Sequence, residues 1–160
     1  MTPMATIPIP ARVLAAIYQH ARATFPDECC GYLVGPRDAG IDAAVQCRNA
    51  QRDGEHPTHP DRDADTGFVI AGAELLAFAR SLDGDRPARV VYHSHTNGRA
   101  YFSEVDRQVA GAPPHYPVQH LVVGVTQGGL TEAAQFAWSD EAREFVEVAR
   151  WPIDFSQPLV

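Results

Sequence analysis

The spacing of apolar residues along the chain predicts three helices. Residues 11–23 repeat apolar side chains at the intervals that one face of a helix requires. This face consists of Val13, Leu14, Ile17 and Ala21. Pro10 suits the first turn of the helix, and Pro26 lies just beyond its end. Two further helices are expected at residues 71–82 and 103–110, and the second of these begins with a Ser-x-x-Asp sequence.

Runs of β-type residues predict about six strands, most of them in hairpin-like succession. The expected strands are residues 31–36, 41–50, 88–95, 118–125, 131–138 and 144–150. Turn residues separate the first two, so we expect these strands to pair as a hairpin. Residues 1–9 should form a loose N-terminal arm and residues 152–160 a C-terminal tail. The pattern predicts an α/β or α+β domain, in which helices flank a mixed β-sheet.

The composition suits one domain spanning residues 1–160. With 45% hydrophobic residues, the chain has enough apolar material for a packed core. A net charge of −7 argues against nucleic-acid binding and against docking on an anionic membrane. No apolar run approaches the roughly 18 residues of a membrane span. The odd number of cysteines, 3, argues against a disulfide framework, so we expect a cytoplasmic protein. The sequence leaves open whether it forms a homodimer.

The segment from Tyr92 to Asp106 carries the strongest chemical signal. His93 and His95 stand two residues apart at the end of a predicted strand, so both side chains project to the same face. Two imidazoles in that arrangement can reach one metal ion. Asp106, in the first turn of the next helix, can return an oxygen to the same point. Three such ligands leave the fourth tetrahedral position open, which is typical of catalytic zinc sites.

This segment resembles the signature of a known family of metallopeptidases. His93-Ser94-His95, seven further residues, Ser103, two more and Asp106 match the motif of the JAMM (MPN+) zinc metallopeptidases. The resemblance extends over residues 10–150 in element order, and it implies a JAMM/MPN-like, cytidine-deaminase-like fold.

An upstream glutamate completes the resemblance. Glu28, after the first helix and at the start of a strand, occupies the place of the family's glutamate. Ala100-Tyr101 after the histidines is more similar to the small bacterial members, which process the C-terminal tail of ubiquitin-like sulfur-carrier proteins. Thr96 and Phe102 stand where many members carry proline, which bears on substrate preference rather than on metal binding.

The resemblance also implies a mechanism. His93, His95 and Asp106 would hold Zn²⁺, and Glu28 would act on a water first as general base and then as general acid. Ser103 would donate a hydrogen bond to the oxyanion. The substrate would be the extended tail of a ubiquitin-like sulfur-carrier protein, for example a carrier–cysteine adduct. The polar residues 49–67 would form a flap over it.

Simpler explanations of these residues stay open at this point. Ser103 could be only a helix N-cap and Asp106 only its capping partner. His93 and His95 could be surface histidines at a strand end, and Glu28 could be a structural acid beside a helix end.

Other histidines and cysteines have structural explanations, and the function has alternatives. His56 and His59 fit a solvated loop better than a metal site, and Cys29 and Cys30 fit a buried strand start. A non-hydrolytic binding or scaffold module for a ubiquitin-like protein is the main alternative to a peptidase. A zinc amidohydrolase of small molecules is a third.

Overall fold

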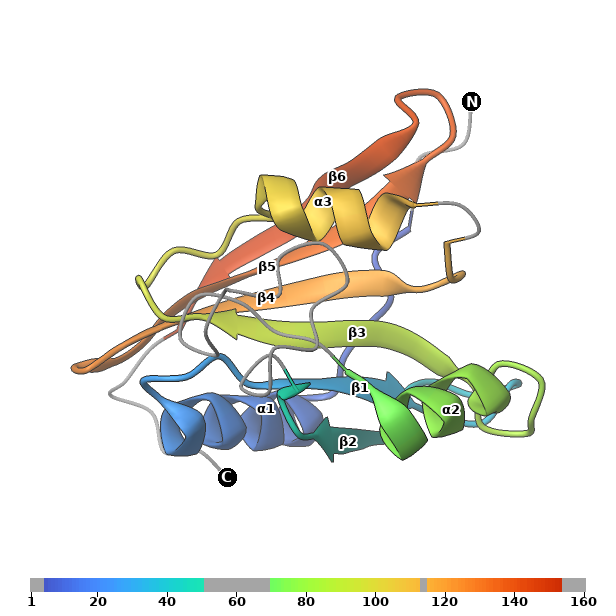
Figure 1. The fold of residues 1–160 in the computed structure, drawn as a ribbon, viewed down its shortest axis with the longest axis horizontal. Coiled ribbons are helices and arrows are strands. Elements are labelled where there is room, and N and C mark those ends of the chain that lie inside the picture. The colour runs from blue at the N-terminus through green and yellow to red at the C-terminus, as the bar shows by residue number, and fades with distance from the viewer. Residues whose placement is uncertain (1–4, 51–69, 113–114, 154–160) are drawn as a thin grey trace.

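The computed structural model describes residues 5–50, 70–112 and 115–153 of the chain (Figure 1). Within these residues, a six-stranded sheet has the strand order β2-β1-β3-β4-β5-β6. The elements in chain order are α1 Ala11–Thr24, β1 Cys30–Val34, β2 Ala43–Cys47, α2 Gly72–Ser81, β3 Ala88–His95, α3 Glu104–Gly111, β4 Gln119–Thr126, β5 Gly129–Ser139 and β6 Glu144–Pro152.

The helices and strands expected from the sequence are confirmed. Their ends differ from the predicted ones by at most three residues, the largest difference being the end of β2 at Cys47 rather than at residue 50. β1 and β2 pair antiparallel as the predicted hairpin. Pro152, expected to open the C-terminal tail, still belongs to β6, and residues 154–160 of that tail lie outside the described residues. No helix among the described residues is long and apolar enough to cross a membrane.

The sheet is mixed because of one crossover. β3 and β4 run parallel, whereas the other neighbouring strands pair antiparallel. Parallel neighbours cannot be joined by a tight turn. The chain therefore leaves the C-terminal end of β3, passes through α3 and returns to start β4 (Figure 1). This crossover brings the start of α3 close to the last residues of β3.

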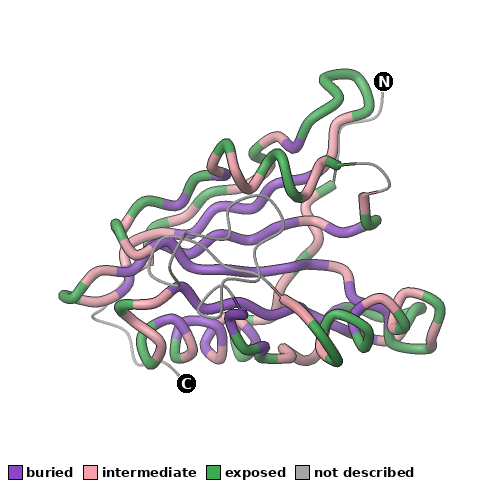
Figure 2. Tube along the Cα trace, viewed as in Figure 1, coloured by how far each residue is buried: buried purple, intermediate pink, exposed green. Residues whose placement is uncertain are grey.

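Helices cover both faces of the sheet. α1 packs against one face, where Ile17 lies in a core cluster with Tyr92 and Leu121. On the opposite face, Phe78 of α2 packs over β1 and β3, while Phe102 before α3 and Ala110 near its end pack over β4 and β5. The buried residues follow the central strands, while the outer surfaces of the helices are exposed (Figure 2). The second face therefore carries two separate apolar clusters, one over β1 and β3 and one over β4, β5 and β6.

The N-terminal arm has no regular secondary structure in its described part, residues 5–9, as expected. Two glutamine side chains of the sheet hold it. Gln119 donates to the Ala5 carbonyl at 2.8 Å and accepts from the Ile7 amide at 3.1 Å. Gln135 donates to the Ile7 carbonyl at 3.0 Å. The arm is thus held on the sheet by hydrogen bonds between these glutamine side chains and its backbone amide and carbonyl groups.

Candidate metal centre

The central strand β3 positions the two histidines. β3 lies between β1 and β4, so its last residues are covered on both sides by paired backbone. Strand alternation turns His93 and His95 to the face covered by α2 and α3, as predicted, and it turns Ser94 to the α1 face. His93 is fully buried, and only 6% of the His95 surface is exposed. These imidazoles are held in the protein interior.

Three donor atoms converge at this point. The Nε2 atoms of His93 and His95 lie 3.1 Å apart, and Asp106 Oδ2 lies 3.1 Å from the first and 3.2 Å from the second. A tetrahedral ion with bonds of about 2.0–2.1 Å requires donors about 3.3–3.4 Å apart. Two imidazole nitrogens and a carboxylate oxygen are also donors that zinc accepts. The three residues therefore fit a zinc ion in spacing and in chemistry.

The N-terminus of α3 orients the carboxylate. Ser103 is the N-cap residue, and its Oγ accepts from the Asp106 amide at 3.0 Å. Asp106 Oδ2 accepts in return from the Ser103 amide at 3.0 Å, which completes a capping box. The same Oδ2 faces both imidazoles. The cap thus aims the oxygen at the histidines, so capping and metal binding are compatible functions of Asp106.

The charges of the site keep Asp106 ionised. Burial alone would raise the pKa of this carboxyl, but the charge of His93 and the close side-chain contacts with both imidazoles outweigh it. The pKa of Asp106 therefore lies well below its usual range. Burial lowers the pKa of His95, which favours the neutral ring. An anionic oxygen and a neutral imidazole are the forms that bind metals.

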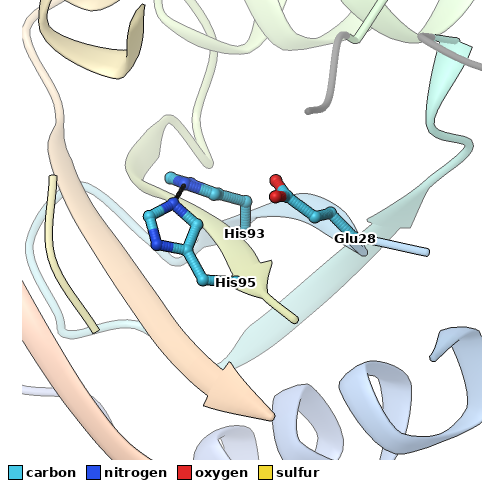
Figure 3. Close-up of side chains that lie close together, drawn as sticks. All are labelled: Glu28, His93 and His95. Atoms are coloured by element: carbon cyan, nitrogen blue, oxygen red, sulfur yellow. Dashed lines mark hydrogen bonds between the residues drawn. The ribbon is translucent and has the colours of Figure 1, made fainter. Parts of the chain in front are cut away.

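Glu28, two residues before β1, also belongs to the site. Antiparallel pairing places Cys30 opposite His93 and continues one step further, where Ser94 Oγ accepts from the Cys29 amide at 2.8 Å. Alternation then turns Glu28 to the face of the histidines. Oxygen and nitrogen atoms of Glu28, His93 and His95 lie within 4.8 Å of one another. Figure 3 shows the buried carboxylate pointing toward the two imidazoles.

Comparison with known proteins identifies the family of this chain. The family described as prokaryotic homologs of the JAB domain matches residues 10–147. The chain belongs to this family. The JAMM/MPN membership expected from the histidine motif is confirmed, and so is the mixed sheet flanked by helices.

Two curated relatives are also similar to this chain. Proteins named CysO-cysteine peptidase from Mycobacterium tuberculosis (strain ATCC 25618 / H37Rv) and Mycobacterium bovis (strain ATCC BAA-935 / AF2122/97) are each 34% identical over 110 residues. This match covers 68% of the chain and 68% of each relative.

Solved structures share the fold. A protein from Desulfitobacterium hafniense matches with a TM-score of 0.58 and 19% identity over 86% of each chain. A protein from Salinibacter ruber matches with a TM-score of 0.54 and 21% identity, over 94% of this chain and 93% of its own.

Several residues of this JAB-family chain lie outside the metal centre. Cys29 and Cys30 are buried, and burial raises the pKa of the Cys29 thiol to about 12, so the predicted core position is confirmed. Burial lowers the pKa of His120 to about 3, and its ring packs against those of Phe102 and Phe145. His56, His59 and nearly all of the expected flap at 49–67 lie outside the described residues.

Two sets of residues that position the site were not predicted from the sequence. Asn49 Nδ2 donates to the Glu28 carbonyl at 3.0 Å, and Glu132 and Arg150 contact the loop that follows the histidines. No motif spacing connects these residues with the histidines, since strand pairing alone brings them near. Tyr101 follows the histidines in the loop before α3. It lies with its ring 4.6 Å from that of His95 and is 42% exposed.

Proposed function

We propose that this JAB-family protein is a zinc-dependent metallopeptidase that hydrolyses an amide bond at the C-terminal tail of a ubiquitin-like sulfur-carrier protein. The observation that carries the proposal is the triangle of His93, His95 and Asp106 donor atoms with sides of 3.1–3.2 Å. The relatives named CysO-cysteine peptidase support a carrier–cysteine adduct as the substrate.

His93, His95 and Asp106 would hold the ion, and their donor set leaves a tetrahedral position for the reactants. Zinc would supply Lewis-acid activation of the scissile carbonyl and of the attacking water. Glu28 is the carboxylate next to the histidines on the same face of the sheet. It takes the proton of the water as general base and delivers that proton to the leaving amine as general acid.

Ser103 completes the chemistry by donating its hydroxyl hydrogen to the oxygen that gains negative charge. Its Oγ already accepts from the Asp106 amide, and accepting leaves the hydroxyl hydrogen for a second partner. Ser103 can thus cap α3 and stabilise the oxyanion at once. No covalent intermediate is required, which agrees with cysteines that are buried and have a raised pKa.

The cysteines also support the compartment. Cys29, Cys30 and Cys47 are free and buried. Free thiols persist in reducing surroundings. We therefore place the reaction in the cytoplasm, where carrier proteins with reactive sulfur groups would be kept reduced.

The direct test is hydrolysis of a carrier protein extended by one cysteine after its Gly-Gly end. We expect the zinc-loaded protein to release free cysteine, a chelator to stop the release, and added zinc to restore it. The same carrier ending at Gly-Gly is the matched control. Zinc binding and carrier binding without any release of cysteine would contradict the proposal and favour a non-hydrolytic binding module.

Zinc should also stabilise the fold, because the site joins β3 to α3. At a zinc concentration about 1,000 times the dissociation constant, the free energy of unfolding should rise by about 4 kcal/mol. For a domain of this size that corresponds to a melting temperature higher by about 8–16 °C. Calorimetry with and without zinc measures the change in melting temperature. Magnesium at the same concentration is the control, and an equal shift with magnesium would contradict a nitrogen-rich zinc site.

Substitutions of Ser103 separate its two functions. Ser103→Ala should cost about 1 kcal/mol of stability through the lost cap, whereas Ser103→Gly should cost only about a few tenths of that. Both variants should lower kcat by about 10²–10³-fold, because both lack the hydroxyl donor. Denaturant unfolding and steady-state kinetics measure the two effects. A Ser103→Gly protein with wild-type kcat would leave Ser103 as a cap alone.

A further inference from the structure

The ring of His95 is oriented by a backbone carbonyl of the next loop. His95 Nδ1 lies 3.2 Å from the Arg99 carbonyl oxygen. Because a carbonyl oxygen only accepts, Nδ1 must carry the hydrogen. The neutral ring then has its lone pair on Nε2, the atom that faces His93 and Asp106. The place of the Arg99 carbonyl therefore selects the tautomer that can bind a metal.

The residues on either side of Arg99 are held by side chains of β5 and β6. Thr131 Oγ1 donates to the Gly98 carbonyl at 2.6 Å. The Ala100 amide donates to Glu132 Oε2 at 2.9 Å, and Arg150 Nη2 donates to the Ala100 carbonyl at 2.6 Å. Both peptide groups of Ala100 are thus bound. The Arg99 carbonyl lies between two fixed points and has little freedom to move.

The contacts form one connected group. Arg150 Nη1 lies 2.9 Å from Glu132 Oε2, so the two side chains that hold Ala100 also hold each other. The loop is seated directly on β4, because a Cβ at Gly124 would lie 2.6 Å from the Gly98 carbonyl oxygen. The Glu132 and Arg150 side chains are 32% and 39% exposed, and a pair that exposed contributes little to stability as an ion pair. Its hydrogen bonds to the loop are the contacts that matter for the site.

We propose that Thr131, Glu132 and Arg150 are positioning residues that hold the Arg99 carbonyl where it sets the ring orientation and tautomer of His95 for metal binding. The inference rests on the proposed zinc site. It places part of the control of metal affinity on β5 and β6, which are two and three strands away from β3 on the side opposite β1. Groups that orient a metal-binding histidine typically contribute 10–100-fold in affinity.

The test measures the zinc dissociation constant of the full chain by competition with a chromophoric chelator. The variants are Thr131→Val, Glu132→Ala and the two combined. We expect the combined variant to bind zinc about 10–100-fold more weakly than wild type. Glu132→Gln should recover most of the affinity lost in Glu132→Ala, because an amide oxygen still accepts from the Ala100 amide. Asp42→Asn is the matched control, since it disrupts the exposed Asp42–Arg86 pair, which has no contact with the loop.

A second measurement reports on the histidine itself. Two-bond ¹H–¹⁵N correlations of the zinc-loaded protein should show the His95 hydrogen on Nδ1 in wild type. The Thr131→Val protein should show a broadened or shifted Nδ1 signal. Thr131→Val replaces a single hydroxyl by a methyl group on a half-buried side chain. This variant therefore still tests the inference if the combined variant loses stability.

The outcomes separate this inference from the proposed function. Equal zinc affinity and equal His95 signals in wild type and all variants would overturn the inference alone. Weaker zinc binding in the variants, together with a wild type that releases no cysteine, would support the inference and contradict the peptidase. A wild type that binds no zinc would overturn both.

Discussion

We expect the Glu28→Gln protein to bind zinc as wild type does and to release cysteine with a kcat lower by about 10²–10⁴-fold. Glutamine keeps the shape of glutamate and can accept a hydrogen bond, but it cannot take a proton from the attacking water. The buried position of Glu28 beside His93 and His95 leaves bulk water as a poor substitute base. Single-turnover kinetics with the carrier–cysteine substrate measures the loss.

The zinc dissociation constant decides which function Glu28 has. Its carboxylate lies close enough to His93 and His95 for these three residues together to bind a metal ion. If zinc affinity fell by more than about 100-fold along with kcat, Glu28 would be a ligand and not the base, because groups that do not touch the ion typically contribute no more than about 10–100-fold. Glu104→Gln is the control for the loss of one acidic charge near the site. Glu104 lies in the first turn of α3 and is exposed.

The second large effect is expected for Asp106→Asn. The amide oxygen of asparagine can still accept from the Ser103 amide, so the cap of α3 should survive. The site would lose its only anionic donor among His93, His95 and Asp106. Groups that merely orient a ligand contribute 10–100-fold, so we expect zinc affinity to fall by more than about 100-fold. Chelator competition measures the affinity, and the melting temperature of the zinc-free protein checks the cap.

The zinc-free melting temperature makes the Asp106 result specific. If Asp106→Asn lowered it by more than about 8 °C, a loss of roughly 2 kcal/mol or more, the weaker zinc binding would reflect damage to α3. Wild-type zinc affinity in Asp106→Asn would show that Asp106 is a capping residue only. Wild-type affinity in the Ser103→Gly protein would show that Asp106 reaches the ion without help from the hydroxyl.

The sequence was most informative where local periodicity carries the geometry. The alternation of strand side chains placed His93 and His95 on one face, and the Ser-x-x-Asp pattern located the start of α3. The expected hairpin of β1 and β2 also followed from local signals, because turn residues lie between two short apolar runs. Each of these features depends on residues that are neighbours in the chain.

Local sequence patterns do not predict which distant segments of the chain pair with each other. The neighbourhood of Glu28 and His93 arises because β1 and β3 pair with Cys30 opposite His93, a register that no turn specifies. Asn49 reaches the Glu28 carbonyl only because β2 lies beside β1. The motif match pointed to Glu28 by resemblance, but its contact with the histidines is a property of the sheet.

By itself, the sequence determined the helices and strands, the face that carries the two histidines and the cap that contains Asp106, because dihedral preferences and side-chain periodicity act within a few residues. Only the tertiary structure decided that β3 lies between β1 and β4. It also decided that α3 returns Asp106 to within 3.2 Å of both imidazoles, and that Arg150 holds the loop beside His95. These contacts join residues far apart in the chain, and burial of both faces of one sheet is what brings them together.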